Sequence, residues 1–228
     1  MKRYITILLF LALNYLNGLS QTVIKPNQSL KSPETLEISK IEMLAGKTVI
    51  YLTIENRIAG GYFCADRNIY ILDPAGNKYN LVKATGIPVC PDTYSFKSVG
   101  EKLSFTLTFP PLKEGTGWID IVEDCPDNCF WFYGITLDNE LNKTLDDAFL
   151  TAEKGSPADN MNLFKGILDR IDNQNPGIEG LLYINIINAA VEDNDKVNAL
   201  VFYKRLAKSN APRVDQYLKY LNDRGIKY

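Results

Sequence analysis

The side chains most able to do chemistry lie in the stretch DCPDNC at residues 124–129, which holds two thiols and two carboxylates. Three kinds of site use such groups: zinc sites, thiol–disulfide redox sites and calcium sites. A four-thiolate zinc site needs two close C-x-x-C pairs, and a redox pair needs C-x-x-C at the start of a helix. Here a single C-x-x-x-C pair lies between expected strands, without EF-hand spacing. We therefore interpret the stretch as a loop closed by a disulfide, and we expect no metal and no cofactor.

The chain has four cysteines, and an even number of cysteines in an exported protein favours disulfides. Three pairings are open. We favour Cys64 with Cys90 and Cys125 with Cys129, because the second pair is local and the other two pairings would cross-link distant segments. The short loop contains a proline and an asparagine, which favour the turn that such a disulfide requires. The longer loop should contribute more to stability.

Histidine is absent from the whole sequence. This excludes histidine-based catalytic triads, histidine zinc sites and histidine pH switches. Enzymes that use carboxylates remain possible. Asp120, Glu123, Asp124 and Asp127 form an acidic cluster, but a glycosidase needs two carboxyl groups across a cleft, about 5–10 Å apart, and neighbours in the sequence rarely provide that. We interpret the cluster as a solvent-exposed rim.

Four aromatic residues follow the loop directly, from Phe130 to Tyr133. On a strand, Phe130 and Phe132 share one face, and Trp131 and Tyr133 share the other. One pair is expected in the core. The other pair either lies under the helical half of the chain, which we favour, or forms an exposed binding face. The residues of the candidate binding surface are Asp124, Asp127, Trp131 and Tyr133.

Residues 1–20 have the composition of a secretory signal peptide. The basic start MKRY precedes the apolar stretch ITILLFLAL, and small residues at 18 and 20 precede a predicted cleavage before Gln21. The apolar run is shorter than the roughly 20 residues that a membrane span needs. The alternative is a membrane anchor that stays attached. We expect a secreted or periplasmic protein with no membrane span in its mature chain.

Residues 34–137 show one strand pattern after another, separated by turns rich in glycine and proline. The expected strands are 35–44, 48–56, 61–64, 68–72, 78–82, 103–109, 118–123 and 130–137. About eight short strands at this spacing predict an antiparallel β-sandwich. The polar residues 21–33, which include two prolines, are predicted to be a flexible leader.

After residue 137 the spacing of apolar residues becomes helical. Residues 138–157 are predicted to be a linker, with a possible short helix over 145–153. The helical region, 158–228, is predicted to hold four helices, at 159–172, 176–191, 194–208 and 211–224. The second is apolar on nearly every face, which indicates burial between neighbours or a strand. Helix starts recur after about 34 residues, close to a tetratricopeptide repeat, but the residue pattern does not repeat, so we favour a plain bundle packed on the sandwich.

Four segments of the strand-rich half carry a resemblance to a known group. These are IEN at 54–56, IYILDPAGNKY at 69–79, VGEKLSFTLTFP at 99–110 and WIDIVE at 118–123. Over residues 47–137 the chain resembles the exported bacterial immunoglobulin-like β-sandwich domains of the MPT63-like group, named after a mycobacterial secreted antigen. The two cysteine pairs and the helical tail depart from that pattern. The resemblance implies export and a fold, and it implies no shared active site. The expected fold class is α+β, an antiparallel immunoglobulin-like sandwich followed by a bundle of about four helices.

These observations favour an exported, non-catalytic module that binds a protein or a surface polymer of the cell envelope. The formal net charge is −2 and no basic stripe is present, which argues against a nucleic-acid partner. The first alternative is a carboxylate-based hydrolase of envelope glycans, which needs a cleft with two converging carboxylates. The second is a structural subunit of a surface assembly, which needs a long uncovered edge strand.

Overall fold

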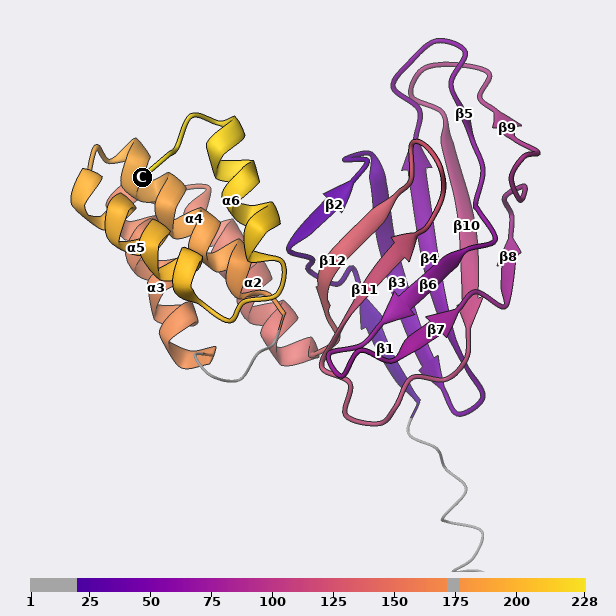
Figure 1. The fold of residues 1–228 in the computed structure, drawn as a ribbon, viewed down its shortest axis with the longest axis horizontal. Helices are drawn as coiled ribbons and strands as arrows, with labels where there is room; N and C mark the ends of the chain where they lie inside the picture. Colours follow the sequence, from indigo (N-terminus) through magenta and orange to yellow (C-terminus); the bar gives the residue numbers. More distant parts are fainter. Residues whose placement is uncertain (1–19, 172–176) are drawn as a thin grey trace, which may run out of the picture.

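The computed structural model describes residues 20–171 and 177–228 of the 228-residue chain. The predicted signal peptide over residues 1–20 therefore lies outside the described residues, except for Ser20. In the described part, twelve β-strands are followed by five α-helices, which confirms a mixed α+β protein. Figure 1 shows the strands and the helices as two halves that lie side by side.

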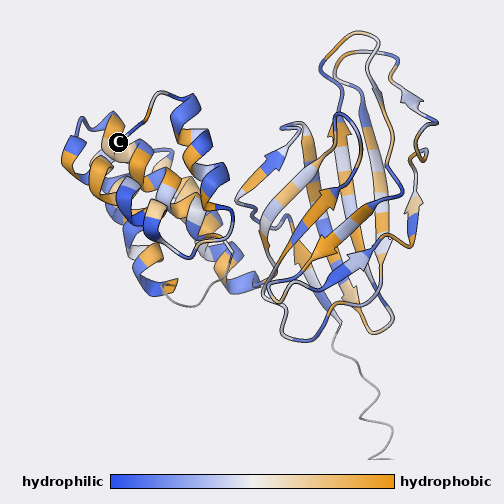
Figure 2. Cartoon of the chain, viewed as in Figure 1, coloured by the Kyte–Doolittle hydropathy of each residue, from blue (hydrophilic) through white to orange (hydrophobic). Residues whose placement is uncertain are grey.

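Sheet A is a five-stranded antiparallel sheet with the strand order β1-β3-β4-β10-β8. Its strands are β1 (Gln21–Ile24), β3 (Leu36–Leu44), β4 (Lys47–Glu55), β10 (Lys102–Phe109) and β8 (Lys83–Thr85). The alternation predicted along β10 is confirmed, because Phe105, Leu107 and Phe109 are all buried. Figure 2 shows this alternation of hydrophobic and hydrophilic residues along the long strands.

Sheet B is a second five-stranded antiparallel sheet, with the order β2-β12-β11-β6-β7. Its strands are β2 (Leu30–Ser32), β12 (Trp131–Thr136), β11 (Trp118–Glu123), β6 (Ile69–Leu72) and β7 (Lys78–Asn80). The strands β5 (Tyr62–Phe63) and β9 (Tyr94–Ser95) form a separate short pair. In Figure 1 the β2 edge of sheet B lies toward the helices.

The two sheets share one hydrophobic core. Leu52 and Phe105 from sheet A belong to the same buried cluster as Ile71, Ile121 and Phe132 from sheet B. Because the inner faces of both sheets are buried in this core, the outward-facing side chains of sheet B are the ones that remain available to the helices.

All eight predicted strands are present, each within two residues of its predicted ends.

The prediction of a flexible leader over residues 21–33 is wrong. β1 pairs with β3 along its whole length, from Gln21 opposite Met43 to Ile24 opposite Lys40, and β2 pairs with β12. These edge strands are four and three residues long, and Val23 is the one buried residue of β1. So short a strand carries too little alternation to be recognised, because its neighbour in the sheet supplies the register.

The predicted linker over 138–157 is also wrong, because most of it forms the helix α2 (Asn139–Ala152). Asp138 caps this helix: its side-chain oxygen accepts hydrogen bonds from the N–H groups of Glu140 and Leu141, at 2.8 and 3.0 Å. The first turns carry few apolar residues, so the spacing of Leu145 and Ala148 revealed only the second half of the helix.

The four remaining helices are those predicted: α3 (Pro157–Ile171), α4 (Glu179–Glu192), α5 (Lys196–Lys208) and α6 (Val214–Asp223). Pro176, where the second was expected to begin, lies outside the described residues. α4 is a helix and contacts α3, α5 and α6, which explains its apolar surface. The five helices share a hydrophobic core of their own. No helix in the described part is both long and apolar enough to cross a membrane.

Candidate functional site

An ion pair joins the helical half to sheet B. Arg213, directly before α6, donates from Nη2 to Oδ2 of Asp120 in β11 at 2.5 Å, and from Nε to the same oxygen at 3.2 Å. The other oxygen of Asp120 accepts the N–H of Gly134 at 2.8 Å. The Asp120 side chain is only 4% exposed. The predicted exposed acidic rim is therefore wrong for Asp120, because its cation lies 93 residues away in the sequence and left no local signal.

The aromatic pair on the outer face of β12 lies where the helices meet the sheet. The rings of Trp131 and Tyr133 stack, with centroids 4.4 Å apart and planes inclined by 15°. The Arg213 guanidinium lies 4.6 Å from the centre of the Tyr133 ring. Burial raises the pKa of the Tyr133 hydroxyl, with Arg213 acting in the opposite direction. Phe130 and Phe132 point into the core, so the division of the four aromatics between two faces is confirmed.

Two glycines allow the backbones of the two halves to approach closely. Gly134 in β12 and Gly177 before α4 have φ angles of 61° and 78°. A Cβ atom on Gly134 would lie 2.1 Å from the carbonyl oxygen of Gly177. The same carbonyl accepts a hydrogen bond from the hydroxyl of Ser29 at 2.8 Å. Any side chain at Gly134 would therefore push the halves apart.

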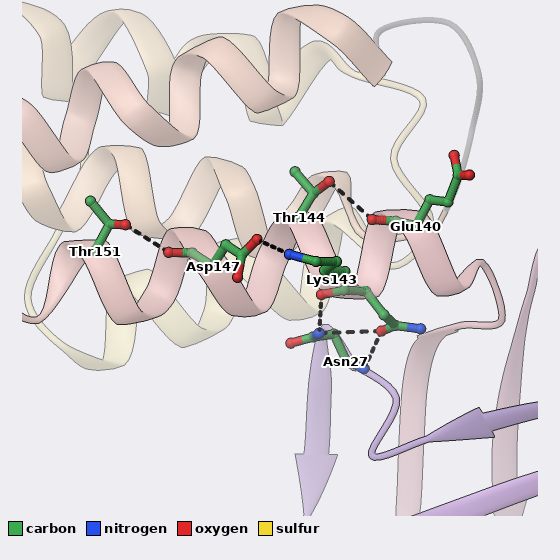
Figure 3. Close-up of polar contacts among 7 residues, drawn as sticks. Asn27, Glu140, Lys143, Thr144, Asp147 and Thr151 are labelled. Atoms are coloured by element: carbon green, nitrogen blue, oxygen red, sulfur yellow. Dashed lines mark hydrogen bonds and ion pairs between the residues drawn. The ribbon is translucent and has the colours of Figure 1, made fainter.

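A polar contact between the start of the β half and α2 completes the junction. The N–H of Asn27 donates to Oδ1 of Asn142 at 2.7 Å, and the Asn27 side-chain amide donates to Asp146 at 2.9 Å. Figure 3 shows Asn27 against α2, near Lys143. Asn142 in turn donates to the carbonyl oxygen of Thr136 at the end of β12, at 3.0 Å. The halves are thus held at several separate points.

A cleft of about 410 Å³ opens between the two halves, and we call it the Trp131 cleft. Its lining from the β half consists of Gln28, Ser29, Leu30, Lys31, Glu34 and Trp131. Its lining from α4 and α6 consists of Leu181, Ile184, Gln216, Lys219, Tyr220 and Asp223. Apolar and aromatic side chains are joined here with charged ones, which is usual for binding sites.

The Trp131 cleft holds two carboxylates and two aromatic rings. Its two carboxylates are Glu34, which is exposed, and Asp223, which is paired with Lys219 at 2.6 Å. The guanidinium of Arg224 lies 3.6 Å from the centre of the Tyr220 ring. The aromatic and apolar side chains of this surface can offer a ligand stacking and apolar contact.

The two disulfides border a second, smaller cavity of about 290 Å³, which we call the disulfide pocket. The disulfides join Cys64 to Cys90 and Cys125 to Cys129, which is the pairing that the sequence favoured. Asn128 lies in the left-handed region, with φ 57°, as the expected turn requires.

Glu123 lies on the wall of the disulfide pocket. One of its carboxylate oxygens accepts the N–H of Asp66 at 2.8 Å, and the other accepts the N–H of Phe130 at 2.9 Å. Burial raises the pKa of this carboxyl, although the two N–H groups act in the opposite direction. Glu123 is 6% exposed, so the predicted exposed rim is wrong for this residue as well. Both carboxylate oxygens accept hydrogen bonds from backbone N–H groups, and this arrangement suits a structural role.

The structure separates the four residues predicted as one binding surface. Trp131 lines the Trp131 cleft, Tyr133 lies under Arg213, Asp127 lines the disulfide pocket, and Asp124 is exposed beside it. Sequence reasoning did not find Tyr220 or Leu181, which face Trp131 across the cleft. The sequence showed only that these two residues lie in helical segments. The spacing of apolar residues in a helix does not say which of its faces meets the sheet.

Protein-family models, curated proteins and solved structures were each compared with the chain, and none of them matches it. Within residues 20–171 and 177–228, no three cysteine, aspartate or glutamate side chains gather as a group that could hold a metal ion. The Trp131 cleft, which both halves of the chain line, is the candidate site.

Proposed function

We propose that this chain is an exported, non-catalytic binding module that takes a segment of an envelope protein or surface polymer into the Trp131 cleft. One observation carries the proposal: Trp131 of the β half and Tyr220 and Leu181 of the helical half line the same cleft. Ligand sites form preferentially between structural units, where apolar walls and a few polar groups converge. Both halves would then contribute to affinity.

Export is part of the proposal. The composition of residues 1–20 supports it, as do the two disulfides, because disulfides persist in oxidising compartments. These two features together support a secreted or periplasmic location.

We also propose that the β half is an immunoglobulin-like sandwich of the exported bacterial group that its segments resemble. Two antiparallel five-stranded sheets around one core support this assignment. The fold would present loops and one sheet face to partners, and here the helices occupy part of that face.

The two alternatives receive less support. A glycan hydrolase needs two free carboxyl groups across a cleft, whereas Glu123 uses both oxygens on backbone N–H groups and Asp223 is paired. A subunit that assembles by strand addition needs a long edge strand, whereas β1, β2, β7 and β8 are three or four residues long. The binding module remains the function that the geometry supports best.

The proposal is tested by capture in the source cells. The tagged mature chain, residues 21–228, is cross-linked gently and purified from the envelope fraction, alongside the variants Trp131→Ala and Tyr62→Ala. Tyr62 is a matched control, because it is an aromatic residue that is 68% exposed and lines the disulfide pocket instead. Circular dichroism of each variant establishes that it is folded.

We expect a stoichiometric protein or polymer partner that Trp131→Ala loses and Tyr62→Ala keeps. The reverse pattern would move the binding site to the disulfide pocket. Cleavage of envelope polysaccharide by the purified chain would overturn the non-catalytic assignment.

A further inference from the structure

A second groove lies in the helical half and shares no lining residue with the Trp131 cleft. Its volume is about 720 Å³, within the range of ligand pockets. One face of α5 provides Val201, Lys204, Arg205 and Lys208, at the spacing that places side chains on the same side of a helix. We call it the α5 groove. It concentrates three cations in a chain whose formal net charge is −2.

In the other helices of this half, the lysines form ion pairs within their own helix. Lys143 in α2, Lys165 in α3 and Lys219 in α6 each form an ion pair with an aspartate four residues later. On α5, position 208, four residues after Lys204, is another lysine, and like charges at this spacing destabilise a helix. Among the ion pairs of the part of the chain that the structure describes, none involves Lys204, Arg205 or Lys208.

The end of a helix alone accounts for only part of this arrangement. Cations in the last turn are favoured by the helix dipole, by about 0.3–1 kcal/mol each. That effect acts on Arg205 and Lys208, which lie in the last turn of α5. The helix dipole does not explain why Lys204 and Lys208 lie four residues apart, and it does not explain why all three cations line one groove.

The wall chemistry selects the class of ligand. Val201, which is 45% exposed, adds apolar surface beside the cations, so the groove suits anionic groups carried on an apolar body. The Arg205 guanidinium lies 5.0 Å from the Phe202 ring and 5.9 Å from the Tyr183 ring, and a guanidinium held against rings can still grip a carboxylate with two N–H groups. Tyr183 is only 6% exposed, so no aromatic platform for a sugar is offered.

We propose that the α5 groove binds an acidic peptide segment of a partner protein, with carboxylates on Lys204, Arg205 and Lys208 and an apolar side chain beside Val201. The local positive charge would also steer such a segment toward an otherwise acidic molecule. This site is independent of the Trp131 cleft, so either one can be correct without the other.

The test is fluorescence anisotropy on the full mature chain with a labelled peptide in which glutamates alternate with leucines. The control peptide has glutamine in place of glutamate. The groove variant is Lys204→Gln/Arg205→Gln/Lys208→Gln. The control variant, Lys143→Gln/Lys154→Gln/Lys165→Gln, removes the same charge from α2, α3 and the turn between them. If the groove variant does not fold, the double variant Lys204→Gln/Lys208→Gln replaces it, because both side chains are exposed.

We expect the glutamate peptide to bind at least tenfold more tightly than the glutamine peptide, and to weaken as salt is raised. The groove variant should lose this preference and the control variant should keep it. Equal binding of the two peptides, or an equal loss in both variants, would overturn the proposal. Inorganic phosphate that binds the same cations as tightly as the peptide would also overturn it, since a bare anion would then suffice.

Discussion

Arg213 reaches Asp120 across the boundary between the two halves of the molecule, with 2.5 Å between Nη2 and Oδ2. Arg213 has the left-handed φ of 65°, which costs a residue with a side chain about 1–2 kcal/mol. That conformation directs the chain into α6 while its side chain crosses to the sheet. The ion pair offsets the cost of the conformation, and it helps hold the walls of the Trp131 cleft in place.

The variant Arg213→Met should destabilise the protein by about 1–3 kcal/mol, because it leaves the buried Asp120 carboxylate without its cation. The estimate is below that for a fully buried pair, since Arg213 is 32% exposed. Lys143→Met, which removes an exposed pair on α2, should change stability by less than about 0.5 kcal/mol. Urea unfolding followed by circular dichroism measures both. The double variant Asp120→Asn/Arg213→Met should recover part of the loss. No recovery would mean that the charge of Asp120 is not the cause.

The variant Gly134→Ala should destabilise the protein by more than about 2 kcal/mol, because the new Cβ would overlap the Gly177 carbonyl and φ is positive. Gly166→Ala in α3 is the matched control, because a Cβ there meets nothing within 4 Å. Alanine in a helix should stabilise it by up to about 1 kcal/mol. Thermal unfolding of the two variants compares them directly. Equal, small effects would show that the halves do not need this close approach.

Removing the Cys64–Cys90 disulfide should cost more than removing Cys125–Cys129. The two bridges close loops with sequence separations of 26 and 4 residues. Chain entropy gives roughly 3.5 kcal/mol for the longer loop and roughly 2 kcal/mol for the shorter one. Paired cysteine-to-serine variants, compared by urea unfolding, measure the difference. A larger loss from the Cys125–Cys129 pair would mean that this loop supports the structure through contacts rather than through entropy.

Glu123 should make stability fall as the pH rises. Burial raises the pKa of its carboxyl above the usual 4.5, so the folded state favours the protonated form. Its contribution is complete below the unfolded pKa and is lost as the pH rises through the folded pKa. Unfolding free energies between about pH 3.5 and 7 should therefore show a slope in the native protein that Glu123→Gln lacks. The exposed control Glu114→Gln should keep the slope. An unchanged slope in Glu123→Gln would assign it to another group.

The sequence revealed the long strands and missed four short ones, β1, β2, β8 and β9. Strands such as β10 and helices such as α5 bury a whole face, so their periodicity is visible in the residues themselves. β1 and β2 bury little, and their place is set by β3 and β12. The polar first turns of α2 hid its start in the same way.

The candidate site was found only in part. Trp131 stood out because aromatic residues alternate with the core pair Phe130 and Phe132. Tyr220 lines the same cleft but lies about 90 residues after Trp131 in the sequence, and Arg213 lies 93 residues after its partner Asp120. Only tertiary packing brings these residues together. Local patterns contain no information about such pairs.

The central claim is that a ligand occupies the Trp131 cleft, and the fluorescence of Trp131 tests it most directly. The chain has two tryptophans, so Trp131 is the sole reporter in a Trp118→Phe variant that circular dichroism shows to be folded. Acrylamide quenching is measured for this variant with and without the partner captured from the envelope fraction. We expect the bound partner to protect Trp131 from quenching. A partner that binds at saturation while Trp131 stays equally quenchable would contradict it.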